Sequence, residues 1–427
     1  LDDGNQVHAL STNTPAPIPT MTMTPSVPFC TPYTEYYVVG TENSDLVEDL
    51  QAAVHCANSS SEDNVIDLNN QVLIVEEYYW GYSGFNTVKP IEPKSSAGTL
   101  TIQNGALERA SHLTCPAEGT SSGTVYFRFF TVKAGGDLTL DNITLANGCS
   151  NNANLNPSVR NDEDGGAIYN YGALTLNNST LLNNTAYHYG GAIYNDGLLN
   201  ITNSTITNNQ TADEGGAIYS SFAGQVTINQ STVSDNSSTT SIGGVYSQPG
   251  GSGSLTLSNS IVANSSTTDC DGVVIFTGLN LIEDGSCDAS TNSQLTGDPL
   301  LGALQSNGGS TQTMALLEGS PAIDVGDDTL ATGLTTDQRG SGFPRIYGAQ
   351  VDLGAYEVGG ICSIYDSTLP TGYTVGTVDS DLEADLRQAI ECANLLASND
   401  IIDLNSATLT YIDAPVEYDL EGHNTLH

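Results

Sequence analysis

Apolar and polar residues alternate in short phrases that recur through the middle of the chain. The first phrase, Gly165 to Asn170, reads Gly-Gly-Ala-Ile-Tyr-Asn and returns at Gly190 to Asn195, at Gly215 to Ser220 and, in degraded form, at Gly243 to Ser247. Two further phrases, of the types Leu-Thr-Leu and Ser-Thr-Ile, keep step with it. Alternation with a period of two is the pattern of a strand with one buried face. A repeat of about 25 residues cannot bury that face alone, so its copies must stack on one another.

The three phrases of each repeat predict an all-β fold, a right-handed parallel β-helix that forms a three-sided solenoid. Gly-Gly and Asn-Asn pairs mark its turns, and the right hand follows from the chirality of crossover connections. We expect like residues to form ladders along the stack. These ladders are an internal aliphatic one (Ile168, Ile193, Ile218, Val245), a stacked tyrosine one on the opposite side of the same sheet (Tyr169, Tyr194, Tyr219, Tyr246) and an amide one at matching turns (Asn183, Asn208, Asn236).

A helical period appears once, ahead of the solenoid. Between Ser44 and Asn58 the apolar residues Leu46, Leu50 and Val54 fall on one face. Ser44 is placed to cap the first turn, and acidic residues lie near the positive, N-terminal end of the helix. We therefore predict a short N-terminal capping helix over residues 44–58, which covers the open edge of the first rung.

Composition and repeated phrases divide the chain into three expected parts. Residues 1–36 are a linker rich in Pro and Thr, and residues 37–360 are the β-helix module. Residues 361–427 are a linker and the start of a second, repeated module. Within this last part, Cys392-Ala393-Asn394 lies 336 residues after Cys56-Ala57-Asn58 and corresponds to it. An opening rung leaves a strand edge bare, so we expect head-to-tail contact with a neighbouring copy, either a separate subunit or the next repeat of a longer chain.

The charge of the chain limits its partners. Nine basic residues against 49 acidic ones give a formal net charge of -40. A surface this negative repels nucleic acid and anionic membranes, so neither is expected as a partner. The chain also has no run of 18 apolar residues, and we expect no membrane insertion.

The eight cysteines fall into local couples, which favours disulfides and an oxidising, extracellular compartment. The expected bonds are Cys30–Cys56, Cys115–Cys149, Cys270–Cys287 and Cys362–Cys392. Metal binding is the competing interpretation. It is disfavoured because no Cys-x-x-Cys spacing occurs and the six histidines are scattered.

A different series of phrases follows the repeats. It includes Gly297-Asp298-Pro299-Leu300-Leu301-Gly302, Gly319-Ser320-Pro321-Ala322-Ile323-Asp324 and Val351-Asp352-Leu353-Gly354-Ala355-Tyr356-Glu357. In these phrases the chain resembles the choice-of-anchor type Q group of parallel β-helix proteins, which are secreted or surface proteins of prokaryotes. The Gly-Gly-Ala-Ile-Tyr-Asn rungs are similar to those of that group and of polymorphic outer-membrane adhesins. The resemblance implies fold and location and no catalytic residue.

Two arginines in this region invite a structural interpretation. We expect Arg339 and Arg345 to pair with Asp337 or Asp352 and to complete the last rungs, because buried Arg-carboxylate pairs are a common structural device.

Candidate chemistry is sparse. Parallel β-helices include polysaccharide lyases and hydrolases, but the regular rungs offer only Arg160 beside acidic turns, and no Gly-His-Gly phrase is present. We therefore expect no catalytic site and no cofactor. Calcium is the one ion considered, because carboxylates are hard oxygen ligands. Its candidate ligands precede the rung glycines and are Asp162, Asp164, Asp213 and Glu214.

The sequence as a whole favours a non-enzymatic extracellular or cell-surface structural protein whose modules assemble end to end into a filament. An adhesin that binds glycans or surfaces through repeated outward residues is the alternative. A carbohydrate-active enzyme is the third possibility.

Overall fold

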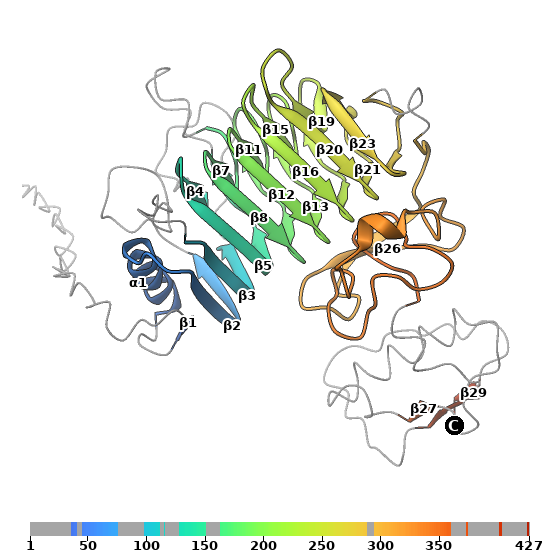
Figure 1. The fold of residues 1–427 in the computed structure, drawn as a ribbon, viewed down its shortest axis with the longest axis horizontal. Coiled ribbons are helices and arrows are strands. Elements are labelled where there is room, and N and C mark those ends of the chain that lie inside the picture. Colours follow the sequence, from blue (N-terminus) through green and yellow to red (C-terminus); the bar gives the residue numbers. More distant parts are fainter. Residues whose placement is uncertain are drawn as a thin grey trace, which may run out of the picture.

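The fold is known from a computed structural model. It describes residues 36–40, 45–75, 98–111, 115, 128–150, 163–287 and 294–359, together with the backbone of three short strands at 373–374, 401–403 and 425–426. Figure 1 shows a solenoid of parallel strands with one helix, α1, at its N-terminal end. The expected linker at residues 1–36 lies almost wholly outside the described residues.

The first coils contain three long strands that bend around a corner, β2 (Asn64–Val75), β3 (Leu100–Arg109) and β5 (Asp137–Ala146). They also contain the short strands β1 (Tyr36–Val38), β4 (Phe130–Val132) and β6 (Cys149–Ser150). The bends of β3 and β5 fall at Asn104 and Asn142, whose φ angles are +57° and +56°. Asparagine tolerates this left-handed conformation better than most residues.

Each regular rung contains four strands rather than the three expected. The first is β7 (Ile168–Asn170), β8 (Ala173–Asn177), β9 (Thr180–Leu182) and β10 (Thr185–Ala186); the second is β11 (Ile193–Asn195), β12 (Leu198–Thr202), β13 (Thr205–Thr207) and β14 (Gln210–Thr211); the third is β15 (Ile218–Ser220), β16 (Gln225–Asn229), β17 (Thr232–Ser234) and β18 (Ser237–Ser238). The last rungs are β19 (Ile242–Ser247), β20 (Ser254–Ser258), β21 (Ile261–Ala263), β22 (Thr268–Gly272), β23 (Val274–Thr277) and β24 (Leu281–Ile282). The fourth strand of each regular rung has only two residues, too few to show a period.

Three parallel sheets run along the solenoid, so the predicted all-β parallel β-helix is confirmed. The largest sheet begins with β1, β2 and β3 and divides at β5 into two arms, one through β8 to β23 and the other through β9 to β24. The second sheet has the order β22-β19-β15-β11-β7-β4. The third has the order β18-β14-β10-β6. The repeat sets the register, since Ile193 lies between Ile168 and Ile218 on adjacent strands.

The glycine pairs of the rung phrase are required by the close approach of the coils. Gly190 has a φ of +67°, a conformation that side chains rarely adopt. A Cβ atom on Gly191 would collide with the carbonyl oxygen of Gly216 in the next rung. The Gly-Gly phrase is therefore a packing requirement of the corner.

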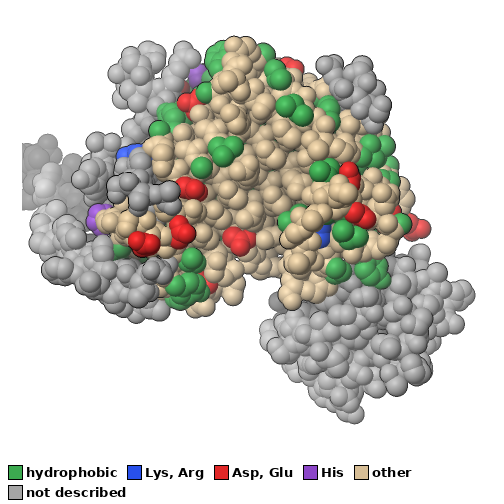
Figure 2. All heavy atoms as spheres, in the orientation of Figure 1, with side chains coloured by type: hydrophobic (Ala, Val, Ile, Leu, Met, Phe, Trp, Pro, Cys, Tyr) green, Lys and Arg blue, Asp and Glu red, His purple; other side chains and the backbone are tan. Residues whose placement is uncertain are grey.

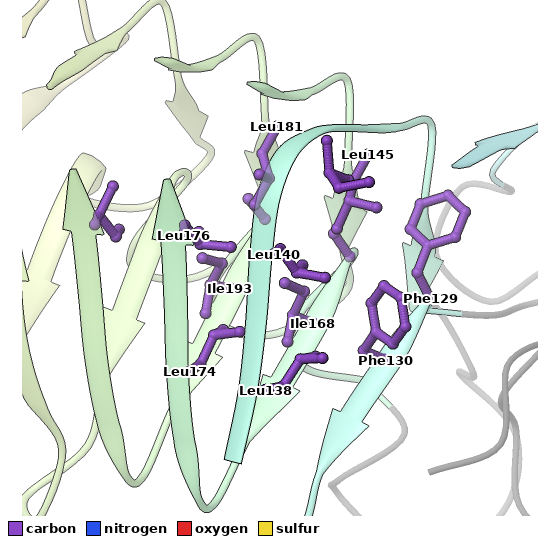
Figure 3. Packing of buried hydrophobic residues seen from close by; sticks show 14 of the residues in the cluster. Phe129, Phe130, Leu138, Leu140, Leu145, Ile168, Leu174, Leu176, Leu181 and Ile193 are labelled. Carbon is purple, nitrogen blue, oxygen red and sulfur yellow. The ribbon is translucent and has the colours of Figure 1, made fainter. Parts of the chain in front are cut away.

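The core is a column of aliphatic side chains inside the coils. Figure 3 shows Leu138, Leu174 and Ile168 pointing into the space between the sheets, with the rings of Phe129 and Phe130 beside them. The predicted internal ladder is confirmed, because Ile168, Ile193, Ile218 and Val245 are adjacent on neighbouring strands and fully buried. At about 25 cal/mol per Å² of buried apolar area, this column dominates the stability of the fold.

The amide ladder lies one residue later than expected in two of its three rungs. Asn184 donates its side-chain N–H to Asn209 Oδ1 at 2.9 Å, and Asn209 donates in turn to Asn236 Oδ1 at 2.9 Å. The expected members Asn183 and Asn208 instead occupy the left-handed corner position, with φ angles of +55° and +56°. An Asn-Asn pair divides the two tasks: the first residue turns the chain and the second satisfies buried backbone groups.

The N-terminal helix α1 covers the end of the core, as expected, but begins slightly later. It spans Leu46–Ser59, and its N-cap is Asp45, whose carboxylate accepts the N–H groups of Val47 and Glu48 at 3.1 Å. The expected cap, Ser44, lies outside the described residues. Leu50 and Val54 pack against the first strands with no exposed surface. The helix therefore shields apolar core that the first coil would leave open.

Residues 294–359 form a lobe on the side of the solenoid. It contains the antiparallel pair β25 (Leu301–Gln305) and β26 (Thr313–Leu316) and a 3₁₀ turn at Asp328–Ala331. We expected the arginine pairs of its closing phrases to complete the last rungs, and this expectation is wrong. The closing phrases instead run back across the outer face of β9, β13, β17 and β21 (Figure 1). There Thr180, Thr205 and Thr232 point outward and are buried beneath the lobe.

Three short strands lie in the region where the second module was expected. They are β27 (Tyr373–Thr374), β28 (Ile401–Asp403) and β29 (Thr425–Leu426), all parallel. Tyr373 pairs with Ile402, and Tyr37, which lies 336 residues earlier, pairs with Ile66. The sequence repeat therefore extends to the register of the first two strands.

Candidate functional site

An aromatic column covers the outer face of the second sheet. Tyr169 stacks on Tyr194 with ring centroids 4.4 Å apart, Tyr194 on Tyr219 at 5.2 Å, and Tyr219 lies 5.4 Å from Tyr246. The predicted tyrosine ladder is therefore confirmed. It follows from the in-register pairing of β7, β11, β15 and β19, which places each ring above its counterpart.

Aromatic residues outside the rung phrase widen this column. Tyr171 lies 4.4 Å from Tyr169, and Tyr189 stacks on Tyr219 at 4.4 Å. His188 is 5.0 Å from Tyr189 and stacks on Tyr187 at 5.6 Å. Tyr187-His188-Tyr189 lies outside the repeated phrases, and nothing in their spacing shows that these rings join the ladder.

The chemistry that the column offers is limited by its stacking. Ring faces are covered by neighbouring rings, so the surface presents ring edges and phenol hydroxyls rather than open faces for a sugar to stack on. Burial, reinforced by the charge of Asp164, raises the pKa of Tyr194 to about 12. Burial also raises the pKa of Tyr219 well above its ordinary value. At neutral pH these phenols are protonated, and each can donate as well as accept a hydrogen bond.

Three of the four calcium candidates lie within the described residues, and these three flank the column without forming a ligand shell. Asp164 is almost fully buried and accepts the backbone N–H of Tyr189 at 3.2 Å. Asp213 faces His188, with 3.5 Å between Oδ2 and Nε2. Burial and then the charge of Asp213 raise the pKa of Glu214. Asp162 lies outside the described residues, and within those that are described no group of three or more His, Cys, Asp or Glu residues is arranged to hold a metal ion.

The most strongly charged interior belongs to the lobe. Arg339 contacts Asp337 at 2.6 Å, as expected, and both are buried. The ring of Tyr356 lies 3.8 Å from the Arg339 guanidinium, which adds a cation–π contact. Arg345 pairs with Glu357 at 2.8 Å and not with Asp352, whose contribution is a backbone carbonyl.

Glu357 was missed by the sequence analysis although it joins both arginine networks. Its carboxylate accepts from Arg345, from Tyr347 N and from Asp352 N at 2.8 to 2.9 Å, while its own N–H donates to Asp337. Burial raises its pKa to about 7 against the opposing charge of Arg345. These ion pairs and hydrogen bonds hold the chain path of the lobe, which indicates a structural role for the cluster.

Two of the expected disulfides lie within the described residues. Cys115 is bonded to Cys149 with a Cα separation of 5.7 Å, and Cys270 to Cys287 with a separation of 5.5 Å. Cys56 is also disulfide-bonded, and its partner lies outside the described residues, as do Cys30, Cys362 and Cys392. Disulfides of this kind are typical of oxidising compartments.

Two segments of the regular rungs are similar to a known family of repeats. Residues 178–196 and 203–221 match the Chlamydia polymorphic membrane protein repeat. The matched segments run from β9 to β11 and from β13 to β15, so each contains the Gly-Gly-Ala-Ile-Tyr phrase. No curated protein shows significant similarity to the chain, and neither does any solved structure. Among the described residues, no helix is both long enough and apolar enough to cross a membrane.

Proposed function

We propose that the chain is a non-enzymatic structural module of an extracellular or cell-surface fibre, in which modules follow one another head to tail. The observation that carries this proposal is the recurrence of the module's beginning. Tyr373 and Ile402 repeat the pairing of Tyr37 and Ile66 at an offset of 336 residues. A chain that begins the same solenoid twice is a tandem array, and tandem solenoids form elongated bodies.

The interior of the module fits a rigid structural role. Ladders of like residues join each rung to the next, as in the buried amides Asn184, Asn209 and Asn236. The lobe then bonds the side of successive rungs: Thr180 donates to Gln312 O at 2.8 Å and Thr205 to Gln338 Oε1 at 2.6 Å. These contacts favour one rigid geometry over the movements that most enzymes need.

A surface location is supported from two sides. The disulfides favour an oxidising environment. The matched repeats belong to proteins described as Chlamydia polymorphic membrane proteins, and the choice-of-anchor type Q resemblance points in the same direction.

The test is electron microscopy of native material labelled with an antibody against the module. We expect labelled fibres at the cell surface with a regular axial repeat. Label confined to the cell interior, or to isolated short rods, would overturn the proposal.

Adhesion is the second candidate, favoured by the outer face of the largest sheet. Its central outward column is a row of partly exposed hydroxyls one rung apart, at Thr101, Thr139, Thr175, Thr227 and Thr256, with Asn200 in the remaining rung. Figure 2 shows a face with scattered carboxylates and wide stretches that are neither charged nor hydrophobic. Such a row suits repeated weak hydrogen bonds to a glycan, a polymer that is rich in hydroxyl groups.

Binding to a glycan panel tests this second candidate. Binding should be lost when Thr139, Thr175 and Thr227 are replaced by Val, and binding that survives this change would exclude the hydroxyl row.

A further inference from the structure

One strand at the C-terminal end of the solenoid has an open edge. Within the described residues one arm of the largest sheet ends at β23, and no strand pairs with the outer side of β23. Residues 273–277 read Val-Val-Ile-Phe-Thr, a segment with high strand propensity and no charge. Val273 and Ile275 are 48% and 51% exposed. Soluble proteins usually protect such an edge with charge, proline or a covering segment, because it pairs readily with other strands.

The edges on either side of β23 are closed by the chain itself. On β22, the N–H of Asp269 donates to Asp284 Oδ2 at 3.1 Å and the N–H of Cys270 to Ser286 Oγ at 3.0 Å. The Cys270–Cys287 disulfide ties down the loop that carries these acceptors. On β24, Ile282 N donates to the carbonyl of Leu295 at 2.9 Å. In the last rung, other parts of the chain therefore hydrogen-bond to the edges of β22 and β24, while the edge of β23 stays open among the described residues.

The outward residues of the sheet change character at the same place. The central outward column carries Thr or Asn at every rung from β3 to β20 and then Ile275 on β23. A half-exposed isoleucine after a row of hydroxyls marks a surface that gains from being covered.

The path of the chain points to one segment that can reach this edge. Val358, near the end of the lobe, packs against an apolar cluster that includes Ile261 and Leu281 of the last rungs, so the lobe ends against this part of the solenoid. From Gly359 to Tyr373 is 14 residues along the chain (373 − 359), a distance that extended backbone can span up to about 46 to 50 Å. The strand reached there, β27, corresponds to β1, which is the opposite terminal strand of the same sheet. Among the described residues, β27 pairs only with β28 and so has a free edge of its own.

We propose that the open edge of β23 is the docking site for β27, the first strand of the following module, which continues the sheet in parallel from one module into the next. The repeat fixes the register. Phe276 lies in the inward column that includes Ile66, the partner of Tyr37, and Tyr373 takes the place of Tyr37. Phe276 then lies opposite Tyr373, and Thr277 opposite Thr374. This junction rests on the proposed tandem arrangement, and it identifies the surfaces that meet.

Cysteine cross-linking of the full chain tests the register. In a Thr277→Cys, Thr374→Cys variant with native disulfides intact, mild oxidation should form an intramolecular bond, visible by peptide mass mapping. The matched control is Asn177→Cys with Thr374→Cys. Asn177 occupies the same outward column four rungs away, on β8. We expect cross-linking at least tenfold faster in the first pair.

A second pair of variants separates docking from folding. Ile275→Lys places a charge on the open strand and should abolish the cross-link while the far-ultraviolet circular dichroism is unchanged. Leu198→Lys, at a site 42% exposed in the middle of the same sheet, should leave the cross-link intact. Equal rates in both cysteine pairs, or cross-linked dimers in place of monomers, would overturn the junction.

The outcome is independent of the test for the fibre. Fibres on cells combined with a failed cross-link would keep the proposed function and discard this junction. A specific intramolecular cross-link in a protein that forms no fibres would keep the junction and discard the fibre.

Discussion

At the scale of single residues, buried polar side chains with complete hydrogen bonding link the rungs. Asn209 has no exposed surface, accepts from the backbone and side chain of Asn184, and donates to Asn236 and to two carbonyls. A buried polar group stabilises a fold only while its partners are satisfied. Each ladder position is therefore sensitive to the loss of its own side chain and of its neighbours.

Replacing Asn209 with Ala should lower the free energy of unfolding by about 3 kcal/mol, because it leaves several buried groups unpaired at once. Denaturant unfolding followed by circular dichroism measures this loss. Asn208→Gly is the matched control. Asn208 is exposed with a φ of +56°, a conformation that Gly adopts freely, so its stability should stay within about 0.5 kcal/mol of wild type. Equal losses in both variants would mean that the ladder contributes nothing specific.

A second residue-scale prediction concerns pH. Asp269 is 2% exposed, and burial, with the charge of Asp284 added, raises its pKa from 3.8 to about 6. Between about pH 4 and 6 the folded chain keeps a proton that the unfolded chain has lost. The stability from this group is complete below about pH 4 and is lost as pH rises through 6.

Asp269→Asn should remove this loss. Relative to wild type, the variant should become more stable by about 2 kcal/mol as pH rises from 4 to 7. Thermal unfolding across this range, with wild type subtracted, measures the difference and cancels the titration of the other carboxylates. Asp271→Asn, at an exposed position on the same strand, is the control and should give a flat difference. A flat profile for Asp269→Asn as well would show that Asp269 titrates alike in the folded and unfolded chain.

At the scale of elements, the sequence predicts the strands that are long enough to show an alternating pattern and misses shorter features, even where these repeat. The rung phrases place Ile193 and Tyr194 correctly because a strand with one buried face has a period of two, and stacking fixes the register. The two-residue strand β14 has no period, and the choice between Asn208 and Asn209 for the ladder depends on a backbone angle. An alternating pattern of apolar and polar residues predicts neither the short strand nor the choice of asparagine.

The lobe shows the other limit. Its phrases predicted a location and a pair of arginines, but the partner of Arg345 is set by how the segment folds back across the rungs. No local spacing links Arg345 to Asn203 or Thr180 to Gln312, which are 142 and 132 residues apart. Contacts of this range are determined by packing, so sequence periodicity cannot supply them.

The lobe should detach when its central polar contact is removed. Gln338 is 1% exposed; its side-chain amide donates to Thr180 Oγ1 at 2.9 Å and accepts from Thr205 at 2.6 Å. Gln338→Ala should speed hydrogen exchange in β9, β13 and residues 337–357 at least tenfold, with α1 unaffected. The reason is that local opening separates the lobe from these strands before the rest of the chain unfolds. Gln350→Ala, whose side chain bonds only within the lobe, is the control. Uniformly faster exchange along the whole chain would instead indicate global destabilisation.

At the scale of the molecule, the net charge of -40 acts against the rigid stack. Two of the nine basic residues, Arg339 and Arg345, are buried in pairs within the lobe and do little to balance the acidic surface. Unscreened like charges destabilise a compact state through self-repulsion. The Debye length falls from about 30 Å at 0.01 M salt to about 3 Å at 1 M, so added salt weakens this repulsion.

The melting temperature should therefore rise by several degrees between 0.01 M and 0.5 M NaCl, and the reason is screening rather than a specific ion. Asp164 is bonded to the backbone of Tyr189 and Asp213 faces His188, so neither is poised as part of a ligand shell. At matched ionic strength, CaCl2 and MgCl2 should then raise the melting temperature equally. Differential scanning calorimetry makes the comparison. A rise with calcium that magnesium does not reproduce would contradict simple screening and assign a calcium site to the acidic turns, with Asp213→Asn and Glu214→Gln as the variants that should abolish it.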